Sequence, residues 1–252
     1  MKLRRWLLPL AILVAWQGLC SLGAFPAYKL PSPWQILQGL ADLIILGMPP
    51  GHHLHNHLLF SLYRVAAGFL AAGILAVPLG LVMGWSPYLR DLVTPVVEVL
   101  RPVPPLAWIP IAILWFGIGI TSAGFIIFLG AFFPILLNTI AGVTSVNPTL
   151  VEAARTLGAS ERQILAKVLL PGAMPNIFVG LRVGLGIGWM TLVAAEFTGV
   201  RSGYGLGYMI MTARDIQRAD EIMAGMAVIG LTGLLIDACL RAVQARLVPW
   251  KP

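Results

Sequence analysis

Between Arg101 and Glu152 the chain runs for fifty residues, 102–151, without an Asp, Glu, Lys or Arg. One membrane crossing needs roughly 20 apolar helical residues, so this stretch is long enough for two, with a natural break at 117–122. Charged residues make up 11% of the chain, whereas soluble domains carry about 25%. The sequence therefore predicts a polytopic membrane protein and excludes a water-exposed globular fold.

The other apolar segments complete an all-α protein with six transmembrane helices. The predicted spans are 6–24, 61–85, 92–117, 123–143, 174–199 and 222–241. We expect the first to be a retained anchor, because no small-x-small cleavage site follows its long apolar stretch. This organisation predicts an anchor helix and external loop over 1–60, a compact core over 61–245 and a cytoplasmic tail over 246–252.

Basic residues are distributed asymmetrically between the predicted loops. If both termini are cytoplasmic, ten basic residues lie inside and four outside, as the positive-inside rule requires. The inner ones are Lys2, Arg4, Arg5, Arg90, Arg155, Arg162, Lys167, Arg241, Arg246 and Lys251; the outer ones are Lys29, Arg201, Arg214 and Arg218. The net charge of +7 is therefore a topology signal and requires no nucleic-acid partner.

Prolines interrupt the third predicted span. Residues 101–105 read RPVPP and Pro110 follows, and this run cannot form one regular helix, because each proline lacks a backbone donor and clashes with the preceding turn. Broken backbone in a membrane is buried in protein or lines a wet cavity, and transporters bind solute at such breaks. A solute pathway and a kinked packing helix both remain open.

Three charged side chains inside the spans are candidates for function, because such charges are energetically unfavourable in lipid. Arg101 and Arg182 are suited to contact an anionic solute, and Glu196 to act as a gate or structural partner. Arg182 has a second interpretation, in which its long side chain reaches the inner interface.

Two local charge pairs are expected. Glu98 lies three residues before Arg101 and can pair with it if the helix persists there. Asp237 and Arg241 lie four residues apart at a cytoplasmic helix end and should also pair.

Four histidines cluster at 52–57, in the sequence HHLHNH. Alternate histidines can ligate a metal, but no cysteine or acidic residue nearby completes a site. We expect a solvated outer loop and no metal.

Glycines recur every fourth residue at Gly180, Gly184 and Gly188, and again at Gly80 and Gly84. Such stripes allow helices to approach closely in a membrane. Packing within the chain is favoured over a dimer interface.

The largest predicted inner loop contains signals for two short helices. Asn147 and Pro148 provide a capping side chain and a first-turn proline, and Gly158 can adopt the left-handed conformation that ends a helix. Ser160 with Gln163 forms a capping box for a second helix, which we expect to end at Pro171. Such a projection suits insertion into a partner's groove; an ordinary interfacial helix pair is the alternative.

This loop resembles the EAA signature of the permeases of binding-protein-dependent ABC importers. Residues 152–154 read EAA, Gly158 follows after three residues, and after nine more comes VLLP at 168–171, with valine where isoleucine is usual. The resemblance implies that 147–171 are coupling helices that dock on a separate ATPase subunit. The coupling residues it implies are Glu152, Ala153, Ala154, Arg155, Gly158, Ala159 and Pro171.

Further stretches resemble the nitrate, sulfonate and taurine importer permeases, the taurine type most closely. They are RPVPPLAWIP (101–110), WFGIG (115–119), LPGA (170–173), GLRVG (180–184), TLVAAE (191–196) and LVPW (247–250). The resemblance implies a type I ABC importer permease (MetI-like) fold over 61–245, in an inner-membrane homodimer with two ATPase subunits and an external solute-binding protein. The substrate-pathway candidates are Arg101, Pro104, Trp108, Arg182, Thr191 and Glu196.

The expected function is transport of a small anion driven by a partner's ATP hydrolysis. The sequence has no Gly-x4-Gly-Lys-Ser/Thr loop, so we expect this chain to bind no cofactor, with ATP and Mg²⁺ on the partner ATPase. An ion-driven secondary transporter or channel is the alternative, but only Glu98, Glu196 and Asp237 could form its acidic relay. A membrane-embedded hydrolase would need a histidine in a span, and we expect all four histidines in the outer loop.

Overall fold

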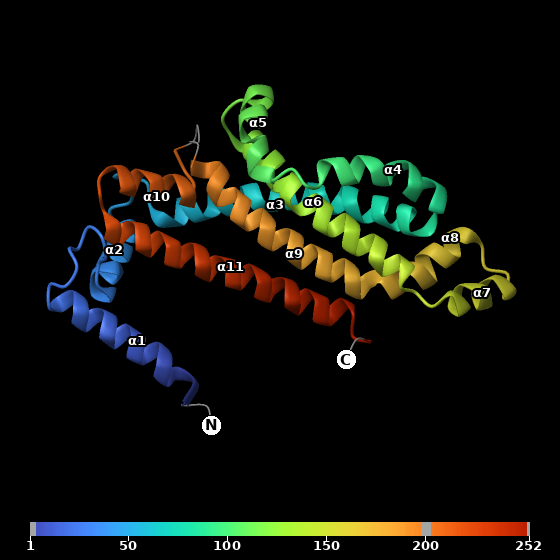
Figure 1. Ribbon diagram of the computed structural model, residues 1–252, viewed down its shortest axis with the longest axis horizontal. Coiled ribbons are helices and arrows are strands. Elements are labelled where there is room, and N and C mark those ends of the chain that lie inside the picture. Colours follow the sequence, from blue (N-terminus) through green and yellow to red (C-terminus); the bar gives the residue numbers. More distant parts are fainter. Residues whose placement is uncertain (1–3, 198–202, 251–252) are drawn as a thin grey trace. The chain divides into compact units, whose positions relative to one another are not determined.

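The computed structural model describes residues 4–197 and 203–250, and these form helices joined by turns and loops, without a β-strand (Figure 1). The all-α prediction is therefore confirmed. The α-helices are α1 (Arg4–Ser21), α2 (Pro33–Ile45), α3 (Leu54–Trp85), α4 (Pro87–Leu100), α5 (Ile109–Phe116), α6 (Ile120–Thr144), α7 (Pro148–Thr156), α8 (Glu161–Ile164), α9 (Leu170–Phe197), α10 (Leu206–Asp215) and α11 (Ala219–Leu247). A 3-10 helix, η1 (Pro105–Trp108), and a π-helical turn, η2 (Leu165–Leu169), complete the list.

The chain divides into two compact units. The first unit combines Met1–Ser61 with Glu196–Thr232, and the second combines Leu62–Ala195 with Gly233–Pro252. Helices α3, α9 and α11 therefore each contribute residues to both units.

Helices occupy all six predicted spans. Four helical runs are long and apolar enough to cross a membrane: α3, α6, Glu161–Phe197 and α11. The apolar part of α1 is shorter, Leu7–Ser21. The predicted span over 92–117 is broken, since α4 and Pro105–Phe116 meet at 79°. The break itself falls at the proline run, as the sequence predicts.

Pro171 does not end the coupling helix, and this expectation is corrected. Helix α8, the turn η2 and α9 form one continuous helical run from Glu161 to Phe197. In the wide turn before the proline, the Leu170 N–H donates to the carbonyl of Leu165, five residues back. Such π-helical turns accommodate irregularities inside longer helices. The helix therefore continues through Pro171, although the proline nitrogen cannot donate a hydrogen bond.

Close helix contacts organise the second unit. Its buried core joins α3, α4 and α6 through Ala72, Ala76, Met83, Val97, Ala131, Ile135 and Leu136. A methyl group added at Gly84 would lie 2.5 Å from Cβ of Val143 on α6, and one at Gly184 would lie 2.9 Å from the carbonyl oxygen of Ala131. The glycine stripes therefore pack helices within this chain, as predicted, because only a residue without Cβ fits there.

A charged cluster holds the first unit together. Arg218 lies in the turn before α11. Its Nη2 lies 2.6 Å from Asp42 Oδ2 on α2, 2.8 Å from Asp220 Oδ2 and 2.9 Å from Glu221 Oε1. Its hydrogen bond to Asp220, and to a smaller extent the one to Asp42, raises the pKa of the guanidinium above its usual value. Desolvation by burial acts in the opposite direction but is the weaker effect. Gly39 lets α2 approach, since an added methyl would lie 2.8 Å from the backbone of Asp220.

Two of the four histidines lie on α3 instead of in the expected loop, and one of them is buried. His57 lies on α3 and is fully buried. Its Nδ1 accepts from the Gly205 N–H at 3.0 Å, and its Nε2 lies 3.2 Å from the His52 carbonyl oxygen. The prediction that all four histidines lie in the loop is wrong for His55 and His57, which are both in α3. His55 is exposed, whereas the ring of His57 pairs with the backbone of Gly205, 148 residues away.

Candidate functional site: a coupling segment and a membrane cavity

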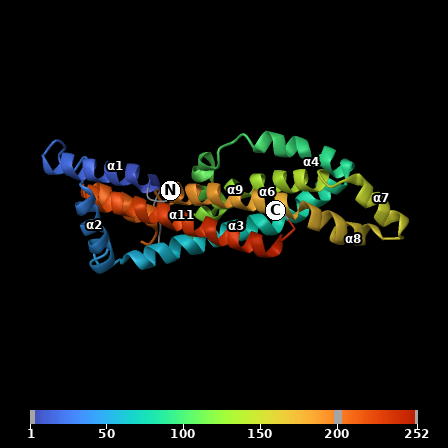
Figure 2. The same cartoon turned by 90° about the horizontal axis from the view of Figure 1, so that it is seen from below.

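The coupling segment, residues 147–171, has the local structure that its sequence predicts. The Asn147 side chain accepts from the Thr149 N–H at 3.0 Å, at the start of α7. Gly158 ends that helix with a left-handed φ of +78°. The Ser160 N–H donates to Gln163 Oε1 at 2.8 Å, which completes the capping box of α8. Figures 1 and 2 show α7 and α8 together at one end of α6 and α9.

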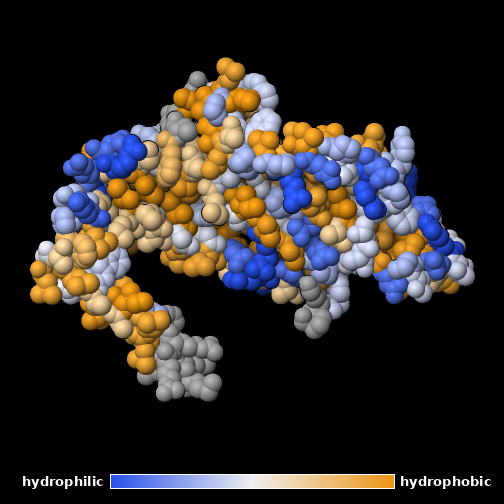
Figure 3. Space-filling view, in the orientation of Figure 1, coloured by the Kyte–Doolittle hydropathy of each residue, from blue (hydrophilic) through white to orange (hydrophobic). Residues whose placement is uncertain are grey.

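The residues of the coupling segment divide into an outer and an inner set. Glu152, Ala153, Arg155 and Gly158 are exposed. Ala154 and Ala159 are half-buried and pack against a core cluster that includes Ile164, Leu169 and Ala173. Figure 3 shows hydrophilic side chains over α7 and α8, in contrast to the mostly hydrophobic surface over α5. The outer set therefore leaves a polar surface of small residues for a partner.

Leu157 is a surface residue that the sequence reasoning missed. It caps α7 just before Gly158, and 87% of it is exposed. Its exposure places a large apolar side chain in the turn between α7 and α8. In the sequence, its position beside the turn residue Gly158 is the signal that would have indicated its exposure.

Pro171 lines a groove instead of ending a helix. The groove has a volume of about 430 Å³ and is lined by Leu150, Lys167, Val168, Pro171, Gly172 and Trp250. The tail thus reaches the coupling segment, an arrangement the sequence reasoning also missed.

Arg155 joins three helices at the base of this segment. Its Nη2 lies 3.4 Å from Glu161 Oε1 on α8. Its guanidinium lies over the ring of Trp85, the last residue of α3, at 5.4 Å from the ring centroid. A cation within about 6 Å of an aromatic face is attracted to it. Arg155 is therefore a contact of the segment with the spans as well as an exposed residue.

A second candidate site lies where α4 ends. A cavity of about 320 Å³, the Arg101 cavity, is lined by Arg101, Val103, Pro105, Leu129, Gly130, Phe133, Pro134, Leu137, Asn138, Val183 and Ile187. These residues come from the break after α4, from α6 and from α9. A broken span thus borders a cavity, as expected where backbone is irregular at membrane depth.

The Arg101 guanidinium has no ion pair or hydrogen bond with any residue that the structure describes. The expected pair with Glu98 is not formed, and this prediction is corrected. Arg101 is the C-cap of α4, with helical φ and ψ and its N–H bonded to the Val97 carbonyl, so the helical spacing is present. Both side chains are nevertheless exposed and do not meet.

Three further pathway candidates do not line this cavity. Pro104 is exposed before η1, and Trp108 packs edge-on against Phe125 at 6.4 Å between ring centroids. Thr191 is buried, and its Oγ1 donates to the Gly188 carbonyl at 3.0 Å. A methyl on the cavity residue Gly130 would lie 3.2 Å from that Oγ1. Thr191 therefore stands behind the cavity wall.

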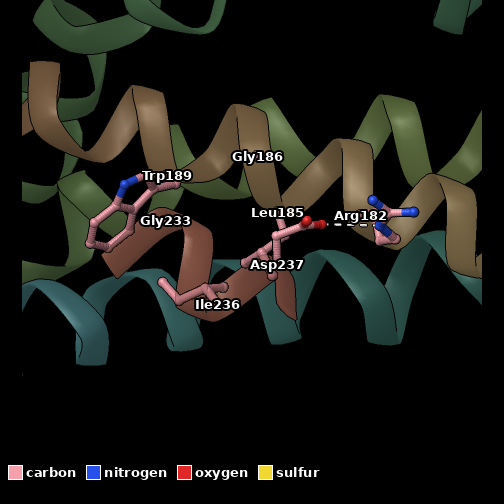
Figure 4. A pocket seen from close by; sticks show the side chains of 7 residues that line it. All are labelled: Arg182, Leu185, Gly186, Trp189, Gly233, Ile236 and Asp237. Atoms are coloured by element: carbon pink, nitrogen blue, oxygen red, sulfur yellow. Dashed lines mark hydrogen bonds and ion pairs between the residues drawn. The ribbon is translucent and has the colours of Figure 1, made fainter. Parts of the chain in front are cut away.

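Arg182 belongs to a different groove, between α9 and α11. Figure 4 shows its guanidinium pointing toward the Asp237 carboxylate, with Trp189 at the other end. Arg182 Nε lies 3.0 Å from Asp237 Oδ1, and Arg241 Nη1 lies 2.9 Å from Asp237 Oδ2. The Arg182 groove has a volume of about 220 Å³. The predicted Asp237–Arg241 pair is confirmed, whereas the partner of Arg182 was missed because it is 55 residues away.

Glu196 belongs to the first unit and is fully buried. Its carboxylate accepts from Ser61 Oγ at 2.8 Å and from the Gly207 N–H at 2.9 Å. Ser61 Oγ in turn accepts from the Leu206 N–H at 2.9 Å. These bonds match the expected structural role, since they tie the ends of α9 and α10 to α3.

A set of apolar spans, a broken helix beside a charged cavity and a polar projecting helix pair define a membrane-embedded transport subunit. Residues 76–251 match the model of the family described as binding-protein-dependent transport system inner membrane component. The chain belongs to this family.

Relatives of known name support the same assignment. The chain is 43% identical to the taurine transport system permease protein TauC of Escherichia coli K12, with 95% of this chain and 86% of the relative covered. It is 40% identical to the putative aliphatic sulfonates transport permease protein SsuC of Bacillus subtilis, with coverage of 97% and 86%. It is 37% identical to the nitrate import permease protein NrtB of Synechocystis, with coverage of 94% and 86%.

The fold has a counterpart among solved structures. Inward-facing conformations of the MetNI methionine ABC transporter match with a TM-score of 0.62 at 21% identity, covering 86% of this chain and 98% of that one. This likeness supports the predicted MetI-like fold. The chain is thus a multi-pass inner-membrane permease component of an ABC importer, a class that works with an ATPase and a binding protein, and it is not an enzyme.

Proposed function

We propose that this permease carries a small oxyanion, of the sulfonate, taurine or nitrate class, which an external binding protein delivers. The relatives named for taurine, aliphatic sulfonates and nitrate support this class. The observation that carries the proposal is the Arg101 guanidinium, which borders a cavity of about 320 Å³ with no carboxylate partner among the described residues.

The electrostatics of the Arg101 cavity favour an anion. A positive charge at membrane depth is unfavourable unless it is paired or hydrated. A guanidinium presents its N–H groups as a planar fork that matches oxyanions in a bidentate geometry. An entering sulfonate or nitrate therefore supplies the missing countercharge. Apart from Asn138, the rest of the lining is apolar and accommodates a short aliphatic part.

In this proposal the coupling segment links the permease to the ATPase whose hydrolysis of ATP drives transport. Residues 147–171 dock in a cleft of the ATPase through Glu152, Ala153, Ala154, Arg155, Gly158, Ala159 and Pro171. Two permease copies assemble with two ATPase subunits, and both termini are cytoplasmic. This chain binds no cofactor, and ATP and Mg²⁺ are held by the ATPase. The polar, small-residue surface and the exposed tip at Leu157 support this docking.

The solute is tested in proteoliposomes that contain this chain, its cognate ATPase and its binding protein. Uptake of labelled taurine, an alkane sulfonate and nitrate is measured with ATP inside the vesicles. We expect ATP-dependent accumulation of at least one of them, and weaker uptake of a neutral analogue of similar size. Preference for the neutral analogue, or accumulation without nucleotide, contradicts the proposal.

The docking is tested with Gly158→Asp and Glu152→Lys. Each should abolish uptake and the coupling of ATPase activity to the binding protein, while the permease remains in the membrane. Thr149→Ser, which retains the Asn147 cap, is the matched control. Normal uptake in both variants would show that the coupling assignment is wrong.

A further inference from the structure

The end of α3 contacts the coupling segment directly. Trp85 closes α3, and the Arg155 guanidinium of α7 lies over its ring at 5.4 Å. Trp85 also packs against the core cluster of Val143, Ile164 and Leu169, which supports α7 and α8. A displacement of α7 therefore acts on α3 through a contact that is independent of the covalent chain.

The same end of α3 is joined to the start of α4. Ser86 caps α4, and Arg90 in its first turn reaches back to α3. Arg90 Nε donates to the Met83 carbonyl at 3.2 Å, and Nη2 donates to the Gly84 carbonyl at 3.1 Å. The last carbonyls of a helix lack partners within it, so these bonds hold the two helices as one corner.

Helix α4 leads from this corner to the Arg101 cavity. Its 14 residues, Pro87–Leu100, span about 21 Å at 1.5 Å per residue. Val97 of α4 is buried in the same cluster as Met83 of α3 and Ile135 of α6. Arg101, the C-cap of α4, lines the cavity. One helix, with Pro95 inside it, thus connects the Trp85 corner to the guanidinium at the break.

We propose that α4 transmits the movement of the coupling segment to the solute cavity, with Trp85 as the positioning residue that Arg155 holds. This inference rests on the proposed function and adds the route by which docking reaches the solute. Contact alone does not establish energetic coupling, so the test removes the aromatic contact and follows the far end of α4.

The reporter is a cysteine at Val103, an exposed residue of the cavity wall, in a chain with Cys20 and Cys239 changed to serine. The full complex in proteoliposomes is labelled with a maleimide, without nucleotide and with ATP plus orthovanadate. We expect the labelling rate in the parent complex to differ between the two conditions. Trp85→Leu, which keeps an apolar side chain, should reduce that difference about fivefold or more.

Two variants separate transmission from simple loss of structure. Trp85→Phe keeps an aromatic face and should retain the nucleotide-dependent labelling and uptake. Trp34→Leu, an exposed tryptophan of α2, is the matched control and should behave as the parent. The ATPase should co-purify with all three variants, because Trp85 lies at the base of the coupling segment and not on its exposed face.

The outcomes distinguish this inference from the proposed function. Retention of uptake and of the labelling difference in Trp85→Leu overturns the α4 route, as does the absence of any nucleotide effect at Val103 in a parent complex that transports. Failure of the ATPase to bind the parent chain overturns the proposed function. If Trp85→Leu does not assemble, Arg90→Gln tests the same corner, with the same loss expected.

Discussion

Two arginines that look alike in the sequence have different environments in the structure. Arg101 borders a cavity of about 320 Å³ without a carboxylate partner among the described residues, whereas Arg182 is bound to Asp237 at 3.0 Å. Both lie in apolar segments, and both are candidates for an anionic solute. The difference teaches that an intramembrane charge is suited to ligand binding only if the fold leaves it unneutralised.

The strongest test of the comparison reverses the charge at the first site. Arg101→Glu should lower solute uptake about 100-fold, since it removes hydrogen bonds from a charged donor to the anion, which contribute about 1.5–3 kcal/mol, and adds repulsion. Arg101→Lys should retain part of the uptake, because it keeps the charge. The assay is ATP-dependent uptake in proteoliposomes with quantified ATPase in the complex. Uptake of Arg101→Glu at the parental rate would remove Arg101 from the pathway.

A pair of space-filling variants comes next. Leu137→Trp should fill the Arg101 cavity and lower uptake about tenfold, through overpacking of about 1–3 kcal/mol. Gly186→Leu adds a similar bulk in the Arg182 groove, where nothing lies within 4 Å of an added Cβ, and should leave uptake unchanged. The comparison is measured as initial uptake rates at equal permease content. An equal loss in both variants would show that the groove also takes part in transport.

Removing the carboxylate in the groove should affect stability. Asp237→Asn leaves Arg182 and Arg241 without their shared carboxylate partner. The free energy of unfolding should fall by about 1–3 kcal/mol, because hydrogen bonds to a charged group are broken. The expected fall in Tm is several degrees, read from thermal unfolding in detergent. The double variant Arg182→Gln with Asp237→Asn should recover part of this fall, because fewer charges are stranded. Independent, additive effects would argue against their pairing.

The smallest effect is expected for Arg182→Gln alone. Arg182 already has a countercharge, and Asp237 keeps Arg241 after the change. The apparent KM for the solute should therefore stay within about twofold, since a neutralised arginine adds little specific anion binding. A large increase in KM, with the Tm unchanged, would assign solute contact to Arg182 as well.

Local features were predictable because neighbouring residues determine them. The Asn147 cap, the Gly158 turn and the Ser160 capping box all depend on side chains within a few residues. The stop expected at Pro171 was wrong because the π-helical turn at Leu165–Leu169 absorbs the proline. The Glu98–Arg101 pair does not form although the helical spacing persists to Arg101, the C-cap of α4, and both side chains are exposed.

Long-range partners were not predictable in the same way. His57 and Gly205, or Arg182 and Asp237, are far apart in the sequence, and no local pattern links them. The contact of Trp85 with Arg155 is of the same kind. Composition shows that such groups need partners, but it does not say which groups the packing brings together.

The amino-acid order alone determined that this chain is helical, that it is embedded in a membrane and that it carries an EAA segment, because apolar run lengths, caps and motif spacing are local properties. Only the tertiary structure decided which arginine is neutralised and where the broken span bends. It also decided that the coupling segment contacts the end of α3, through Arg155 and Trp85. Those outcomes depend on which surfaces meet when α3, α6, α9 and α11 pack, and glycines such as Gly84 and Gly184 set that approach by having no side chain.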